Sequence, residues 1–446
     1  MDSRELHIND LPSEMLLHIF AFLPHLKDRN PLSLVCRRWN DLAFNYNYLS
    51  HIRLKLLLDE DNVEKLHKIS RYYRSVSLHV QLSASLDDEQ IERILTRFEK
   101  PSTSLEELVC IDSSASPDFL ALKLLAICPS VRKFQLDSDW NIPDAELPVL
   151  ENLDELIVTG ITRVNINRLA PNLRRLETWS ELDTLLMVIQ KLPLEHLRVD
   201  FAVIYVDIFQ NCTEVTKLTS VDLFFSPIDQ KGLEQLCKFC PLLSKLRLTV
   251  TKIASLRCLA SLTHLKVLSL YNVNNALFAS KDACLPNVEI VEFTIRENLH
   301  FDSSMQRVFP NVRYLKFEYF YKGWDLTAAT GKVCDGFPRL KTLEFSLCRT
   351  KSYLDQLEGM ADLRELIVGK LPQLTGSSLP PMNAVQCLTL KNTELEVTGE
   401  MVKNLPSLQF VNLYGSSRCI GAGLLPSSCA VRRYLRHGSN DIFDVE

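Results

Sequence analysis

Glycine is scarce in this chain, with 13 residues among 446. Loops that cradle phosphates need glycine, and neither GxxxxGK[ST] nor GxGxxG occurs. Histidine is sparse too, at 10 residues, and no HExxH pair is present. These absences argue against a nucleotide-dependent enzyme or a zinc protease. We therefore expect a protein that is not an enzyme and that uses no cofactor and no metal.

Excess charge and long apolar runs are also lacking. The formal net charge is −5, so we expect no strong attraction to nucleic acid or to anionic membranes. No apolar run approaches the ~20 residues of a membrane helix, and the polar start MDSRELHIND does not resemble a signal peptide. The 13 cysteines are an odd number, which favours reduced thiols. These features predict a cytoplasmic or nuclear protein, or one found in both.

One cysteine pair has the spacing of metal ligands, namely Cys237-x-x-Cys240. A zinc site needs a second pair of ligands at a suitable spacing. Cys258 and His264 do not supply such a pair convincingly. We therefore interpret the two cysteines as buried helix residues.

A repeated pattern, apolar-x-x-apolar-x-apolar, runs through most of the chain. It recurs sixteen times, about every 24 residues, and a period of 20 to 29 is the leucine-rich-repeat signature. Seven of the sixteen starts have a proline two residues earlier, and Thr178 breaks the third apolar position of one unit. The starts are Leu49, Tyr73, Leu105, Val131, Leu153, Leu173, Leu194, Leu218, Leu243, Leu265, Val288, Val312, Leu340, Leu363, Val385 and Leu408.

This period predicts an α/β solenoid, a horseshoe in which each unit adds one short strand and one helix or turn. Within each strand, positions two, four and six after the start should alternate onto the concave face. Such a face is a binding surface and not a catalytic pocket. We expect the solenoid to span residues 49–425 with about sixteen repeats, and residues 426–446 to form a C-terminal cap or a flexible tail.

The first 48 residues have a different, helical pattern. Pro12 and Glu14 suit the first turn of a helix, and Asn30-Pro31 suits a second helix start. Apolar residues then recur at helical spacing through both segments. So small a module needs fewer apolar side chains for its own core, and the excess predicts a partner. The apolar residues at helical spacing include Leu16, Ile19, Phe20 and Leu23 in the first segment, then Leu32, Val35, Trp39 and Leu42 in the second.

The run Leu11-Pro12-x-Glu14-x-Leu16-x-x-Ile19-Phe20-x-x-Leu23, followed by Leu34-Val35-Cys36-Arg37-Arg38-Trp39, resembles an F-box. The resemblance implies a three-helix F-box over residues 1–48 that docks a Skp-type adaptor and so joins a cullin-RING ubiquitin ligase. Two of the repeats, the clearer one running from Ile228 to Leu243, also resemble the cysteine-containing repeats of F-box proteins. The positions that match adaptor-binding or module-core residues of the family are Leu11, Pro12, Leu16, Ile19, Phe20, Leu23, Leu34, Val35, Cys36 and Trp39. The sequence does not tell which of them face outward.

A protein substrate is expected on the later repeats. The interval from Val312 to Leu340 is longer than its neighbours and rich in aromatic residues, which dominate interface energetics. Packing of this long connection on its own side chains is the alternative explanation. The candidate substrate-binding residues are Tyr314, Lys316, Glu318, Phe320 and Trp324.

Together these features predict the substrate-recognition subunit of a Skp–cullin–F-box ubiquitin ligase. Two alternatives remain open. Lys27 to Asn30 and Ser33 to Cys36 also resemble the plant hormone receptors of this class, which bind a phosphorylated inositol on the solenoid. In this chain the candidate cations for such a site are interleaved with acids. The second alternative is a scaffold that needs no adaptor. The candidate cations are Arg175, Arg198, Lys245, Arg247 and Lys316.

Overall fold

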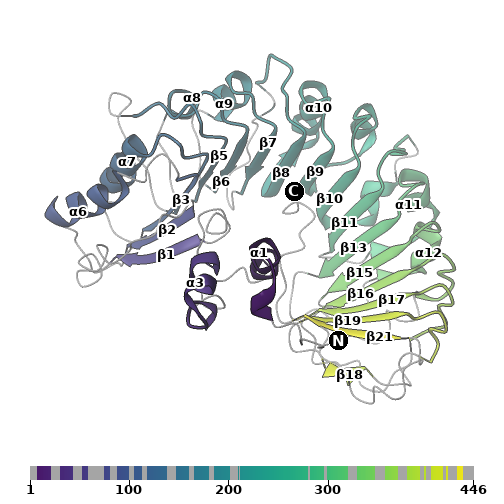
Figure 1. Ribbon diagram of the computed structural model, residues 1–446. Coiled ribbons are helices and arrows are strands. Elements are labelled where there is room, and N and C mark those ends of the chain that lie inside the picture. Colours follow the sequence, from purple (N-terminus) through teal and green to yellow (C-terminus); the bar gives the residue numbers. More distant parts are fainter. Residues whose placement is uncertain are drawn as a thin grey trace, which may run out of the picture. The chain divides into compact units, whose positions relative to one another are not determined.

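The chain forms two compact units, Met1–Leu194 and Glu195–Glu446, in a computed structural model. Figure 1 labels helices and strands of both units. The residues that the structure describes are 8–21, 31–43, 53–58, 75–80, 88–99, 105–112, 118–137, 147–159, 165–179, 185–200, 209, 211–279, 282–295, 299–319, 329–346, 357–369, 379–391, 396–397, 403–414, 418–419 and 429–434.

Unit 1 begins with a small helical module. A 3-10 turn, η1 (Ile8–Asp10), leads into α1 (Ser13–Ala21), and the carbonyl of Pro12 accepts the first α-helical hydrogen bond from the Leu16 N–H at 3.2 Å. Residues 31–33 form a helical turn, and α3 (Arg37–Ala43) follows after a break. The helical pattern that follows Pro31 is therefore divided between this turn and α3. The chain restarts its helix at Cys36, whose thiol accepts a hydrogen bond from the Trp39 N–H at 3.5 Å and so caps α3.

The core of this module is a cluster of four buried residues, Leu16, Phe20, Trp39 and Ala43. The Phe20 and Trp39 rings meet edge to face with their centroids 5.2 Å apart. This geometry is favourable for aromatic pairs and fixes α1 against α3. The partly buried residues that pack around the cluster are Leu11, Leu32 and Leu42.

Among the described residues, the rest of unit 1 contains a ladder of six parallel strands, each paired with the next along the chain. Four described helices are interspersed between the strands: α6 (Asp88–Glu99), α7 (Asp118–Ile127), α8 (Ile166–Leu169) and α9 (Leu185–Lys191). The strands are β1 (Arg53–Leu58), β2 (Ser75–Val80), β3 (Glu107–Asp112), β4 (Lys133–Asp137), β5 (Glu155–Val158) and β6 (Arg175–Thr178).

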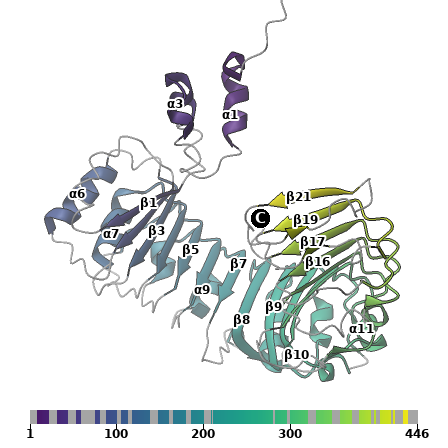
Figure 2. The same ribbon diagram turned by 90° about the horizontal axis from the view of Figure 1, so that it is seen from below.

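Unit 2 continues the same architecture with a longer parallel ladder, which curves within the unit with its helices on the outer side (Figure 2). Its helices are α10 (Gln230–Phe239), η5 (Arg257–Ser261), η6 (Asn275–Phe278), α11 (Ser303–Val308) and α12 (Val333–Gly336). Two short parallel pairs lie outside the ladder, β12 (Leu299–His300) with β14 (Ala329–Thr330), and β18 (Glu396–Val397) with β20 (Arg418–Cys419). The ladder strands are β7 (His196–Val199), β8 (Ser220–Asp229), β9 (Lys245–Lys252), β10 (Val267–Val273), β11 (Ile290–Ile295), β13 (Tyr314–Tyr319), β15 (Thr342–Ser346), β16 (Glu365–Gly369), β17 (Cys387–Lys391), β19 (Phe410–Tyr414) and β21 (Ala430–Tyr434).

These strands confirm the predicted fold class, a leucine-rich-repeat type α/β architecture with an N-terminal helical module. Every predicted repeat start from Tyr73 onward is followed by a strand that begins two residues later, and only β1 begins four residues after its start, Leu49. The second and third pattern residues of the units from Tyr73 onward fill the interior, as Leu246 and Leu248 do in β9. Even Thr178, which breaks the apolar pattern, is fully buried at such a position.

Asparagine side chains connect successive repeats at positions outside the apolar pattern. Asn152, Asn172, Asn287 and Asn311 each stand one residue before a repeat start and donate an amide hydrogen bond to a backbone carbonyl of the preceding repeat, at 2.9 to 3.0 Å. Each bond satisfies a carbonyl in a turn that the ladder does not pair. The bonds hold neighbouring repeats together on the side where the chain enters its strand.

The segment predicted as a cap or flexible tail contributes one more strand. In β21, Val431 pairs with Val411 of β19, and Arg433 pairs with Leu413. The ladder in unit 2 therefore extends to residue 434.

Candidate functional site

Large apolar side chains are exposed on the helical module of unit 1. Leu34 is 86% exposed and Val35 is 53% exposed, side by side in the turn before α3. Met15 and Ile19 lie four residues apart on α1, so they share one face of that helix. Ile8 and Pro12 precede this helix and are exposed too. We call Ile8, Pro12, Met15, Ile19, Leu34 and Val35 the exposed apolar set.

The run Leu34 to Trp39 has a distinct task for almost every residue. Leu34 and Val35 are exposed, Cys36 caps α3, and Trp39 enters the core of the module. Arg38 reaches back to the segment before α1 and donates to the carbonyls of Asn9 and Leu11, both at 2.7 Å, and to Ser13 Oγ at 3.2 Å. This guanidinium fixes the backbone on both sides of Pro12, so it positions part of the exposed apolar set.

The structure divides the predicted adaptor-binding residues into two groups. Leu16, Phe20 and Trp39 belong to the core, and Leu11 packs against it. Leu23 lies outside the described residues. Met15 and Ile8 were not among the predicted residues, although the i, i+4 relation of Met15 to Ile19 is a signal that could have found the former. The residues that face outward are Pro12, Ile19, Leu34, Val35 and Cys36.

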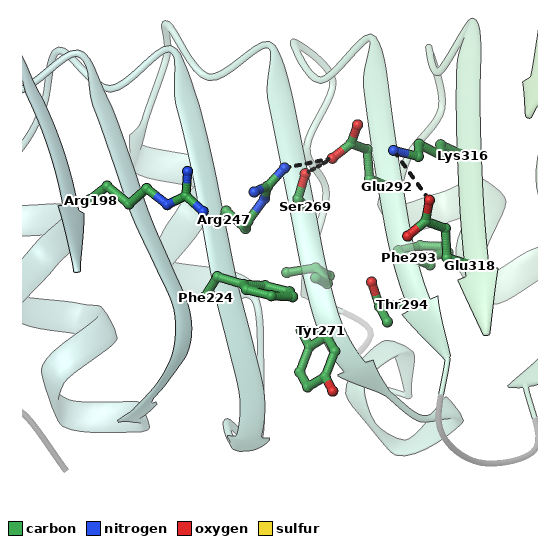
Figure 3. A pocket seen from close by; sticks show the side chains of 11 residues that line it. Arg198, Phe224, Arg247, Ser269, Tyr271, Glu292, Phe293, Thr294, Lys316 and Glu318 are labelled. Carbon is green, nitrogen blue, oxygen red and sulfur yellow. Dashed lines mark hydrogen bonds and ion pairs between the residues drawn. The ribbon is translucent and has the colours of Figure 1, made fainter. Parts of the chain in front are cut away.

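A second candidate site is a depression of about 220 Å³ on the inner face of unit 2 (Figure 3). Six neighbouring strands, β7 to β11 and β13, contribute one residue each to a row across the sheet. Each residue of the row is paired in register with the one on the neighbouring strand. We call these residues the charge row: Arg198, Asp222, Arg247, Ser269, Glu292 and Lys316. All six stand four residues after their repeat starts, as predicted for this face.

Charges of opposite sign neutralise one another along the charge row. Arg247 lies between two buried carboxylates, 3.1 Å from Asp222 and 3.6 Å from Glu292. Asp222 is also 3.7 Å from Arg198, and Glu292 accepts a hydrogen bond from the Ser269 hydroxyl. Because Asp222, Arg247 and Glu292 are almost fully buried, each depends on its partners to offset the loss of water.

An aromatic floor lies beside the charge row. Phe224 and Tyr271 meet edge to face with ring centroids 5.0 Å apart, and the Arg247 guanidinium lies 5.6 Å from the Phe224 centroid. Figure 3 shows these two rings at one level of the strands and the charge-row residues that it labels at another. Glu318 stands in register with Thr294 and Tyr271, at the level of the rings. The depression thus combines an apolar floor with charged walls.

A polar cluster follows on the next strands. The Tyr314 hydroxyl donates to Glu344 Oε2 at 2.6 Å, and Lys391 Nζ lies 2.8 Å from Glu344 Oε1. Burial and the Glu344 carboxylate raise the pKa of Tyr314 well above its ordinary value, so the hydroxyl stays protonated. Burial, and secondarily Glu344, also raises the pKa of the nearby Glu365.

The predicted substrate-binding residues fall into three places. Lys316 and Glu318 line the depression, and their side chains form an ion pair at 3.5 Å. Tyr314 is engaged by Glu344 in the neighbouring polar cluster. Phe320 and Trp324 lie outside the described residues. Arg198, Phe224 and Tyr271 were placed on the concave face by their spacing, but nothing in the sequence brought them together with Lys316.

Eleven of the described cysteines are free thiols. Burial raises the pKa values of the Cys128 and Cys240 thiols to about 12. A hydrogen bond between Cys237 and Cys258 raises the pKa of Cys237 and lowers that of Cys258. Within the described ranges, no three His, Cys, Asp or Glu residues are grouped to hold a metal ion. None of the described helices combines the length and the apolar character that crossing a membrane requires.

Comparison with known proteins identifies the helical module. The F-box-like family model matches residues 8–51, which form an F-box-like domain. No curated protein matches the chain. Among solved structures, an internalin from Listeria monocytogenes is similar to the chain at 14% identity, covering 83% of this chain and 88% of the internalin with a TM-score of 0.28.

Proposed function

We propose that this chain is the substrate-recognition subunit of a Skp–cullin–F-box ubiquitin ligase. The F-box-like domain binds a Skp-type adaptor, and the leucine-rich repeats bind the protein to be ubiquitinated. The chain contributes no chemistry of its own. It raises the effective concentration of a substrate near the charged ubiquitin carrier.

The observation that carries this proposal is the exposed apolar set on the F-box-like domain. Leu34 and Val35 lie within the F-box-like domain, and their apolar side chains are exposed to water. They contribute little to the core of the module, so their exposure is explained by a partner such as the adaptor. Exposed apolar groups that gather on one small module mark a protein interface. The same surface predicts that the chain without an adaptor self-associates.

The pairing of the cations disfavours a receptor gated by a polyanion. Arg175 lies 3.6 Å from Glu155, and Arg198, Arg247 and Lys316 each lie within 4 Å of a carboxylate. A polyanion would have to approach the acids as closely as the bases, and like charges repel at such distances. The charge row in unit 2 therefore suits a partner of mixed charge.

Adaptor binding tests the proposal. The variant Val35→Asp places a charge in the exposed apolar set, and Val215→Asp makes the same change at an exposed valine of unit 2. In titration calorimetry with a purified Skp-type adaptor, we expect Val35→Asp to weaken binding by about 30-fold or more, the size of an interface hot spot. Val215→Asp should bind like the wild type.

Two outcomes would overturn the proposal. If the wild-type chain does not bind the adaptor, the chain is a scaffold that needs none. If Val35→Asp binds as tightly as Val215→Asp, the exposed apolar set is not the docking surface. Equal circular dichroism spectra of the two variants are required for the comparison.

A further inference from the structure

The depression in unit 2 presents opposite exposed charges at its two ends. At the β7 end the Arg198 side chain is 28% exposed, and at the β13 end the Glu318 side chain is 42% exposed. The charged groups between them are far more buried, since Asp222, Arg247 and Glu292 expose 10% of their side chains or less. A ligand in the depression therefore meets the Arg198 cation at one end. At the other end the more exposed group is the Glu318 carboxylate, whose partner Lys316, 3.5 Å away, is 14% exposed.

The floor between these ends is apolar and aromatic. Tyr271 is buried, and its ring meets Phe224 over the intervening strand β9. Such a floor favours an apolar side chain, because removing apolar surface from water favours association. The depression of about 220 Å³ suits one anchoring side chain and not an extended cofactor.

The strand spacing sets the separation of the two charged ends. Five steps between neighbouring strands separate β7 from β13. At ~4.8 Å a step they amount to roughly 24 Å, which an extended peptide covers with about seven residues at ~3.3 Å each. The aromatic floor is centred near β9, two steps or about 10 Å from Arg198, which corresponds to about three residues.

Resting on the proposed function, we infer that the depression recognises an extended segment of the substrate protein. The segment carries an acidic residue that pairs with Arg198 and a basic residue, about seven positions away, that pairs with Glu318. An apolar residue about three positions from the acidic one seats on Phe224 and Tyr271. Charge complementarity at the two ends fixes the register of the segment.

A displayed library of random 12-residue peptides, selected on the immobilised full chain with its adaptor bound, tests this inference. We expect the enriched peptides to carry an acidic and a basic residue six to eight positions apart with an apolar residue between them. On Glu318→Lys the basic position should change to an acidic one, while the other positions stay. On Glu214→Lys, an exposed acid of unit 2 outside the depression, the enriched pattern should match that of the wild type.

A second measurement uses the wild-type chain alone and so does not depend on how the variant folds. The enriched peptide with its acidic and basic residues exchanged should bind the wild type about tenfold more weakly, because two exposed attractions become repulsions. The change of pattern on Glu318→Lys and the weaker binding of the exchanged peptide should both shrink in 0.5 M salt, which screens exposed charges.

The inference is overturned if the enriched peptides lack the charge pair, if Glu318→Lys enriches the same pattern as the wild type, or if no peptide is enriched. Heat released by inositol hexakisphosphate at micromolar concentration, with competition against the peptides, would overturn it in favour of an anion site. Adaptor binding by the same samples separates these failures from a failure of the proposed function, since it depends on the F-box-like domain.

Discussion

Removing one buried charge from the charge row tests whether the row stabilises unit 2. The variant Arg247→Met keeps most of the side-chain volume and deletes the guanidinium between Asp222 and Glu292. Breaking a buried ion pair by removing one partner costs about 3 to 5 kcal/mol, because the remaining charge stays buried.

The remaining contacts place the expected loss at the lower end of that range. Asp222 keeps Arg198 at 3.7 Å and the Phe224 N–H at 3.0 Å, and Glu292 keeps the Ser269 hydroxyl. We therefore expect a loss of about 3 kcal/mol in the free energy of local opening, which corresponds to a factor of roughly 100 in the opening constant. Combining Arg247→Met with Asp222→Asn and Glu292→Gln should restore at least half of the loss, since no unpaired charge is then buried.

Native-state hydrogen exchange is the suitable assay, because repeat arrays open locally and a single melting temperature averages over the repeats. Amides of β8, β9 and β10 should lose about 100-fold of their protection in Arg247→Met, in line with the expected free-energy loss. The control Lys332→Met breaks an exposed ion pair with Glu358 and should leave protection unchanged. If Arg247→Met behaves like that control, or if the triple variant is less protected than Arg247→Met, the reasoning about the charge row is refuted.

Three further predictions concern single residues. Arg38→Met should weaken adaptor binding several-fold in calorimetry with unchanged circular dichroism, because the Arg38 guanidinium donates to the backbone on both sides of Pro12. The neighbouring change Arg37→Met should leave adaptor binding unchanged. The raised pKa of Glu365 means that the folded state binds its proton more tightly than the unfolded state, so stability is lost as pH rises through the folded pKa. Glu365→Gln should therefore melt higher than the wild type at pH 7, with the difference vanishing below about pH 4; an unchanged difference at pH 4 would contradict this. Finally, a bound adaptor should protect the exposed thiol of Cys36 from maleimide modification while the exposed Cys284 stays reactive, and equal labelling of both would place Cys36 outside the interface.

The repeats were predictable because their interior positions are periodic. Residues such as Leu246 and Leu248 recur at fixed offsets, and the strands follow from them. The last strand, β21, escaped prediction because Arg433 stands where β19 has Leu413.

The candidate sites were predictable only in part. On α1, Leu16 and Phe20 face the core while Met15 and Ile19 face outward, and each pair is offset from the other by a single residue. A helix that is apolar over so wide an arc does not reveal from its sequence which stripe is buried. The charge row has the same limitation, since the spacing predicted its face but not that Arg247 would lie between two acids from neighbouring strands.

Ubiquitin transfer in a reconstituted reaction tests the central proposal most directly. The chain would be combined with a Skp-type adaptor, a cullin–RING pair, activating and conjugating enzymes and ubiquitin, and transfer onto the chain itself would be measured. We expect transfer to the wild type and to Val215→Asp, and its loss in Val35→Asp. Equal transfer to Val35→Asp, or no transfer to a wild-type chain that binds the adaptor, would contradict the proposed role.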